Sequence, residues 1–201
     1  MAEFEKPLPL EIKCTSTDCE NDLHCFKAHR KMAPAARGTC RVCGANLVDW
    51  MRVHRRDVKD AAYTFEALQR ELIRHHHFHK LIDENAIRHA RRKGRIRLRE
   101  AVRARLAKYL APAQPVRDGY QTPFKGNVIY YAQHATACCC RTCLEYWHGI
   151  PKGRLLTEEE FEYCMALVDL YVKQRLPDLQ EQSQKVPRRR GAGLETRAAR
   201  P

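Results

Sequence analysis

The spacing of apolar residues predicts helices in the middle of the chain. Between residues 48 and 111, apolar side chains and histidines recur three, four or seven positions apart, which places them on one face of a helix. Gly94 follows a basic run, where a glycine typically ends a helix, so we predict two helices here. Their buried stripes are Phe65, Leu68, Leu72, His75, His79, Ile82, Ala86 and His89 in the first, and Ile96, Leu98, Val102, Leu106 and Tyr109 in the second.

The pattern changes after residue 111. Pro112 and Pro115 interrupt helical structure, because proline cannot donate a backbone hydrogen bond. The β-branched and aromatic run from Val128 to Tyr131 predicts a strand that ends near His134. Residues 141–147 are then expected to form a short helix.

A last helix is predicted from a capping box formed by Thr157 and Glu160. Its inner stripe contains Phe161, Cys164, Val168 and Tyr171. After Pro177 the apolar periodicity ends, which predicts disorder. The whole pattern indicates an α+β fold of small zinc-stabilised modules: a zinc ribbon at 1–50, a basic helical region at 51–111, a strand–knuckle–helix zinc finger at 112–176 and a disordered basic tail at 177–201.

The ten cysteines fall into two groups, with Cys164 alone. Clustered thiols in a reducing compartment favour metal binding over disulfides. In the first group, the spacing predicts a closed, structural zinc site made of Cys14, Cys19, Cys40 and Cys43. Cys25 or His24 is the alternative to one member of the first pair.

The second group lies between His134 and His148 and is the densest chemistry in the chain. Cys140 and Cys143 have the Cys-x-x-Cys spacing of a zinc knuckle, so we expect them to bind a second zinc ion together with His134 and His148. Cys138 and Cys139 compete for the same role. A redox dithiol and buried, inert thiols are the other interpretations.

Residues 75–79 contain four histidines around Phe78. His75 and His79 are one helical turn apart, which a metal site would require. A histidine on an apolar stripe is more often a hydrogen-bonded core residue, so we favour the structural interpretation over a catalytic, metal or polyanion-contacting role.

The formal charge of +13 favours a polyanionic partner. Basic residues concentrate between 91 and 108, and we predict that their outer face contacts nucleic acid through phosphate oxygens. The alternative is a solvated helix face. The arginines concerned are Arg91, Arg92, Arg95, Arg97, Arg99, Arg103 and Arg105. The first residues lack the apolar core of a secretory signal, and no apolar run is long enough to cross a bilayer, so we expect a cytoplasmic protein.

The segment from Tyr131 to Thr157 resembles a small bacterial domain family of unknown function. It contains a His-Ala-Thr segment, then Cys-Cys-Arg-x-Cys and Trp-His-x-Ile-Pro-x-Gly. The resemblance covers about residues 120–176 and implies a bacterial or phage origin and a metal-binding fold, without an established activity. Residues 1–110 look like an added zinc-ribbon and helical module.

Three functions fit these observations, and we favour the first, with the other two as alternatives. The first is a non-catalytic zinc protein that binds DNA or RNA through the arginine face. The second is a metal-dependent nuclease in which His134, His148 or Glu145 contributes to catalysis, and the third is an adaptor with zinc-stabilised protein-binding surfaces. A deaminase is excluded by the pattern, because Thr136 stands where the catalytic acid of a His-x-Glu motif belongs.

Overall fold

The structure is a computed structural model that describes residues 12–116, 118 and 122–186. It is mostly helical. Three one-turn 3-10 helices are η1 (Cys19–Asn21), η2 (Pro34–Ala36) and η3 (Val58–Asp60). The α-helices are α1 (Trp50–Val53), α2 (Ala61–Leu68), α3 (Leu72–His79), α4 (Glu84–Tyr109), α5 (Val128–Ala135), α6 (Arg141–His148) and α7 (Glu158–Arg175).

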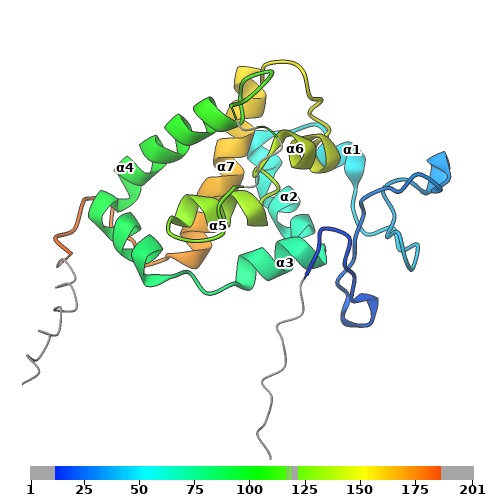
Figure 1. The fold of residues 1–201 in the computed structure, drawn as a ribbon, viewed down its shortest axis with the longest axis horizontal. Coiled ribbons are helices and arrows are strands. Elements are labelled where there is room, and N and C mark those ends of the chain that lie inside the picture. Colours follow the sequence, from blue (N-terminus) through cyan, green and yellow to red (C-terminus); the bar gives the residue numbers. More distant parts are fainter. Residues whose placement is uncertain (1–11, 117, 119–121, 187–201) are drawn as a thin grey trace, which may run out of the picture.

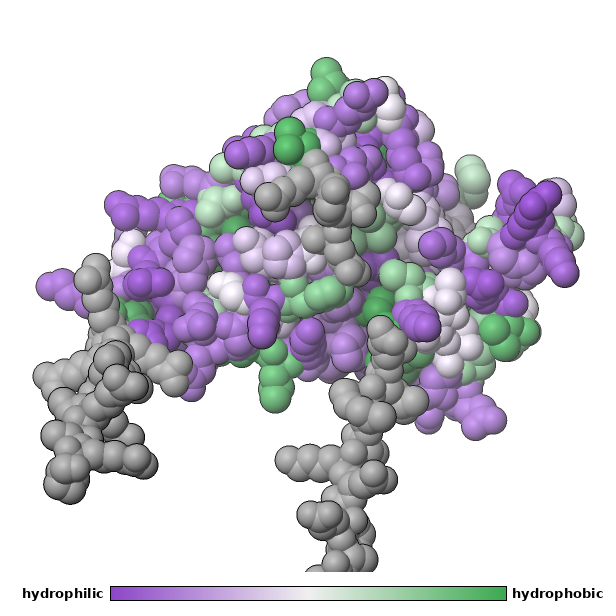
Figure 2. All heavy atoms as spheres, viewed as in Figure 1, coloured by the Kyte–Doolittle hydropathy of each residue, from purple (hydrophilic) through white to green (hydrophobic). Residues whose placement is uncertain are grey.

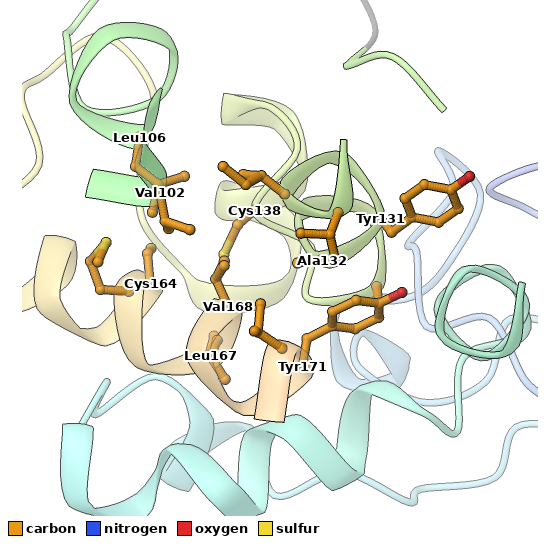
Figure 3. Packing of buried hydrophobic residues seen from close by; sticks show 14 of the residues in the cluster. Val102, Leu106, Tyr131, Ala132, Cys138, Cys164, Leu167, Val168 and Tyr171 are labelled. Atoms are coloured by element: carbon orange, nitrogen blue, oxygen red, sulfur yellow. The ribbon is translucent and has the colours of Figure 1, made fainter. Parts of the chain in front are cut away.

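Helix α7 lies at the centre of the molecule and contacts α2, α4 and α5 (Figure 1). The predicted capping box is confirmed, since the Thr157 side chain accepts from the Glu160 amide and the Glu160 side chain accepts from the Thr157 amide. The predicted stripe on α7 is also buried. Figure 3 shows Val168 and Tyr171 of α7 beside Ala132 of α5, within one apolar core.

The strand expected at Val128–Tyr131 is wrong, because these residues form the first turn of α5. The Asn127 side chain caps this helix by accepting from the amide of Ile129. Nearly every residue of α5 is buried, and a helix buried on all sides has the same apolar composition as a buried strand. Over the described residues we find two isolated β-bridges and no strand, so the α+β ribbon and finger geometry is not confirmed.

The central helices divide more finely than predicted. A turn at residues 69–71 separates α2 from α3 and shifts the helical phase, so that His77 and Phe78 are buried while His79 is exposed. The break at Gly94 is confirmed. Gly94 has φ 69° and ψ 171°, a conformation restricted almost entirely to glycine, and it kinks α4.

The segment after α7 packs on this kink. The carbonyls of Gln180 and Glu181 accept from the amides of Arg95 and Ile96, and Gln184 donates to the carbonyl of Arg91. Leu179 is buried against the core. Residues through 184 therefore continue the fold, and the arginine run 188–190 lies outside the described residues.

Arginine side chains satisfy carbonyls at or near the C-terminal ends of five helices, where the last carbonyls lack intrahelical partners. Each guanidinium comes from another part of the chain. The pairs are Arg175 with Lys80 after α3, Arg141 with Leu110 after α4, Arg74 with His134 of α5, Arg56 with His148 of α6, and Arg95 with Leu176 after α7.

Residues 12–49 form a lobe with little regular structure beside α3 and α6 (Figure 1). A second apolar cluster joins this lobe to the helices. In it, Phe26 packs edge-on against Trp147 of α6 with ring centroids 5.9 Å apart, and Trp50 lies 5.0 Å from Trp147. Among the described helices, none has the length and apolar character needed to cross a membrane.

Candidate metal centres and the basic pocket

The first metal centre consists of Cys19, His24, Cys40 and Cys43, whose ligand atoms all lie within 4.8 Å of one another. The Cys19 and Cys40 sulfurs are 3.7 Å apart, and the Cys43 sulfur is 3.4 Å from Nδ1 of His24. Tetrahedral zinc with ordinary bond lengths requires about 3.8 Å between two sulfurs and about 3.6 Å between sulfur and nitrogen. The donor set and its spacing therefore fit zinc.

The surroundings of the first centre also suit a metal. Asp22 lies 3.0 Å from Nε2 of His24 and so orients the ring with Nδ1 toward the sulfurs. Burial alone would raise the pKa of the Cys40 thiol, but backbone amides of Cys43, Cys25 and Val42 outweigh it and lower that pKa to about 6. Gly44, at φ 75°, turns the chain so that its amide bonds the Cys40 carbonyl.

Cys14 is absent from this group, and His24 occupies the fourth position that we had assigned to a thiol. Cys14 is exposed and lines the pocket that also contains Cys139, Cys140 and Cys143, while the buried Cys25 donates to the Cys14 carbonyl. Cys25 and His24 were the two alternatives for a member of the first cysteine pair, and the structure groups His24 with the other three ligands.

The second metal centre consists of Cys139, Cys140 and Cys143 around the first turn of α6, again within 4.8 Å of one another. The positive end of the helix dipole stabilises thiolates at this place. Hydrogen bonds from Cys139 and Cys140, followed by the charge of Arg74, hold the pKa of Cys143 well below its ordinary value. Among the described residues, no histidine or acidic side chain joins the three thiols as a fourth ligand.

The two histidines expected at this centre have other partners. His148 is fully buried, with Nε2 3.0 Å from the Thr136 carbonyl and Nδ1 3.2 Å from the Tyr163 hydroxyl. His134 donates from Nε2 to the Thr122 carbonyl at 2.8 Å. Cys138 lies in the apolar core, and its thiol donates to the Thr136 carbonyl.

The three thiols line a pocket of about 710 Å³ between α3, α5, α6 and the start of the described chain. Four cations contribute to its wall: Lys13, Lys27, Arg74 and Lys80. His134 lies in the wall with its ring nearly parallel to those of His77 and Phe124, at 4.6 and 4.8 Å between centroids. Burial lowers the pKa of His134 to about 4 and that of His77 to about 2, so both rings are neutral at pH 7.

Of the three candidate catalytic residues, only His134 lines this pocket. Glu145 is exposed and lies 3.5 Å from Lys152. The sequence reasoning missed Glu71 and Arg74, which form a buried ion pair beside the thiols. The sequence did contain a signal for this pair. An acid and a base stand three positions apart where α3 begins, a spacing that brings the two side chains together.

The arginine face of α4 is divided between internal and external roles. Arg95, Arg99 and Arg103 pair with Glu181, Asp169 and Glu162 respectively, and Arg105 donates to Gln133 while covering the ring of Tyr130. Arg91, Arg92 and Arg97 are exposed, and no acidic group of the described residues lies within ion-pair distance of them. Hydrophilic side chains cover most of the face of the molecule drawn in Figure 2.

Residues 62–173 match the family described as a domain of unknown function (DUF4186). The match covers more than half of the 201 residues, so the chain belongs to this family. It includes the second metal centre and extends upstream of the motif that first indicated the resemblance, while the first metal centre precedes it. No solved structure matches the chain.

Proposed function

We propose that the protein is a zinc-dependent enzyme that hydrolyses phosphodiester bonds of nucleic acid at its second metal centre. The observation that carries this proposal is a group of three thiols in the wall of a basic pocket, which no fourth ligand from the described residues joins. A zinc ion held by three protein ligands keeps one position for water, whereas four ligands make a closed structural site. The first centre, with four ligands, is then structural.

The pocket supplies the other groups that such a reaction needs. Lys13, Lys27 and Lys80 are suited to phosphate oxygens, which carry the negative charge of the substrate. His134 is neutral and donates from Nε2, which leaves Nδ1 without a proton and able to accept one. Zinc would lower the pKa of a bound water, as it does in other hydrolytic sites.

The proposed reaction is a simple hydrolysis. Water adds to phosphorus and one phosphorus–oxygen ester bond breaks, which gives a phosphate monoester and a free hydroxyl. The proton released from water would pass to His134 and from there to the departing oxygen, which becomes the free hydroxyl. No redox partner is required.

The coordination state can be tested directly with cobalt(II) in place of zinc. In wild-type protein loaded with cobalt at both centres, added thiocyanate should change the visible spectrum of the second centre, because an open position accepts it, while the closed first centre stays unchanged. An unchanged spectrum at high thiocyanate would show a closed shell and overturn the proposal.

Activity should follow the same centre. Zinc-loaded protein should cleave labelled single- or double-stranded DNA or RNA, and both Cys143→Ser and His134→Ala should abolish cleavage. Cys164→Ala is the thiol control, since Cys164 lies in the apolar core, outside both clusters and outside the pocket. Cleavage that survives in Cys143→Ser would exclude this centre as the active site.

A second candidate is non-catalytic binding of nucleic acid by α4, favoured by the exposed Arg91, Arg92 and Arg97, for which the described residues supply no acidic partner. Reversing Arg91 and Arg97 to glutamate should make the dependence of log affinity on log salt concentration shallower by about one to two. Reversal of Arg99 and Arg103 is the control, because these side chains already pair with α7. An equal effect of both double variants would argue against a specific role for Arg91 and Arg97.

A further inference from the structure

The buried pair of Glu71 and Arg74 lies between the two metal centres and contacts the surroundings of both. We propose that this pair positions the thiolates of the second centre and couples their metal affinity to the occupancy of the first. The proposal rests on metal binding at both centres and is independent of catalysis.

Arg74 provides the link to the second centre. Its guanidinium donates to the Cys143 sulfur at 3.2 Å and approaches the Cys139 sulfur at 4.0 Å, and it also donates to the His134 carbonyl at 2.7 Å. Three thiolates around one divalent ion leave an excess negative charge. A fixed arginine beside two of them offsets that charge and holds both sulfurs in place.

Glu71 fixes Arg74 from the other side. Its carboxylate is fully buried and accepts from Nε of Arg74 at 3.2 Å, from the Tyr146 hydroxyl at 2.6 Å and from the Trp147 indole at 2.6 Å. Both aromatic residues belong to α6, the helix that carries Cys143. The carboxylate therefore ties α3 to the thiol-bearing helix.

The first centre reaches Glu71 through the backbone. The amide of its ligand His24 donates to the Arg70 carbonyl at 2.8 Å, and the His24 carbonyl accepts from the Leu72 amide at 2.9 Å, so the two bonds flank Glu71. Two residues after His24, Phe26 packs edge-on against the ring of Trp147. The ligand segment of the first centre thus covers the buried pair.

The order of this segment depends on metal. Residues 12–49 contain only two one-turn helices, and a segment with so little regular structure commonly folds only around its ion. Loss of the first ion would release the bonds around Glu71 and admit water to the ion pair. The thiolates of the second centre would then lose their positioning, which for groups in this role typically costs about 10- to 100-fold in metal affinity.

The test is a double-mutant cycle on the full chain, with the zinc affinity of the second centre measured by competition against a chromophoric chelator. Cys40→Ser and Arg74→Gln should each weaken that affinity by about 10-fold or more. Combined, they should weaken it little more than the stronger single change, because both act through the same link. Effects that multiply, or an unaltered affinity in Cys40→Ser, would overturn the proposal.

Two further variants separate positioning from general destabilisation. Arg74→Lys keeps the charge and should move the sulfur-to-cobalt charge-transfer band of the cobalt protein back toward the wild-type position, whereas Arg74→Gln should shift it away. Glu71→Gln replaces Arg74→Gln in the cycle if the latter does not fold. Arg97→Gln, exposed and outside both centres and the pocket, should leave the affinity unchanged. Because no turnover is measured, absence of nuclease activity would leave this result unaffected.

Discussion

Replacing Gly94 by alanine should destabilise the protein more than any comparable glycine substitution. A Cβ atom at this position would lie 2.4 Å from the carbonyl carbon and oxygen of Gln182 and 2.6 Å from the Glu181 oxygen, all of them backbone atoms. The φ and ψ values cost a non-glycine residue about 1–3 kcal/mol. Displacing the segment would also weaken the bonds from the amides of Arg95 and Ile96, each worth about 1 kcal/mol.

These effects predict a loss of about 3–5 kcal/mol in the free energy of unfolding, or roughly 10 °C in melting temperature. Urea and thermal unfolding of the zinc-loaded protein would measure it. Gly153→Ala is the matched control, since Gly153 has φ 79° but nothing within 4 Å of its added Cβ, and should lose only about 1–2 kcal/mol. Equal losses in the two variants would refute the role of the C-terminal segment at the kink.

Three other predictions address the metals, a salt bridge and a buried arginine. Native mass spectrometry should find two zinc ions, with Cys40→Ser and Cys143→Ser each losing one; the mass of the bare polypeptide after zinc-replete purification would contradict this. A hydrogen bond from Arg154 lowers the pKa of Glu160 below its ordinary 4.5, so the contribution of this pair is complete above that value and is lost as the pH falls through the lowered pKa. The stability difference between wild type and Glu160→Gln should thus be present at pH 7 and shrink below pH 4.5, and a difference that grows on acidification would reverse the assignment. Arg141→Lys keeps the charge, but a lysine cannot reach the carbonyls of Leu110, Pro151 and Arg154 together. Calorimetry should therefore show a melting temperature several degrees lower. An unchanged melting temperature would show that the three hydrogen bonds do not contribute to stability.

The local patterns that predicted structure were those with a short-range physical cause. The Thr157–Glu160 capping box and the helix break at Gly94 depend on residues within a few positions, and both are confirmed. The strand at Val128–Tyr131 failed because composition reports burial, and burial here comes from α3, α4 and α7 packing around α5. No local pattern contains that information.

The candidate sites divide in the same way. Cysteine spacing located both thiol clusters, since a metal site needs closely spaced donors. Spacing could not rank His24 above Cys14, nor show that the nitrogens of His148 are occupied by Thr136 and Tyr163. These outcomes depend on contacts between segments far apart in the chain.

Because several arginines are bound to carbonyls at helix ends, the net charge of this protein overstates the charge that a polyanionic ligand can contact. A titration counts every guanidinium equally, but an approaching polyanion meets only those whose donors are not already bound to carbonyls. Arginine-selective dicarbonyl reagents should therefore distinguish two populations, with Arg91, Arg92 and Arg97 modified rapidly and the buried Arg74 and Arg141 modified only on unfolding. The modification rate of the slowly reacting arginines would then measure how often their hydrogen bonds to the helix-end carbonyls break, and this measurement needs no ligand.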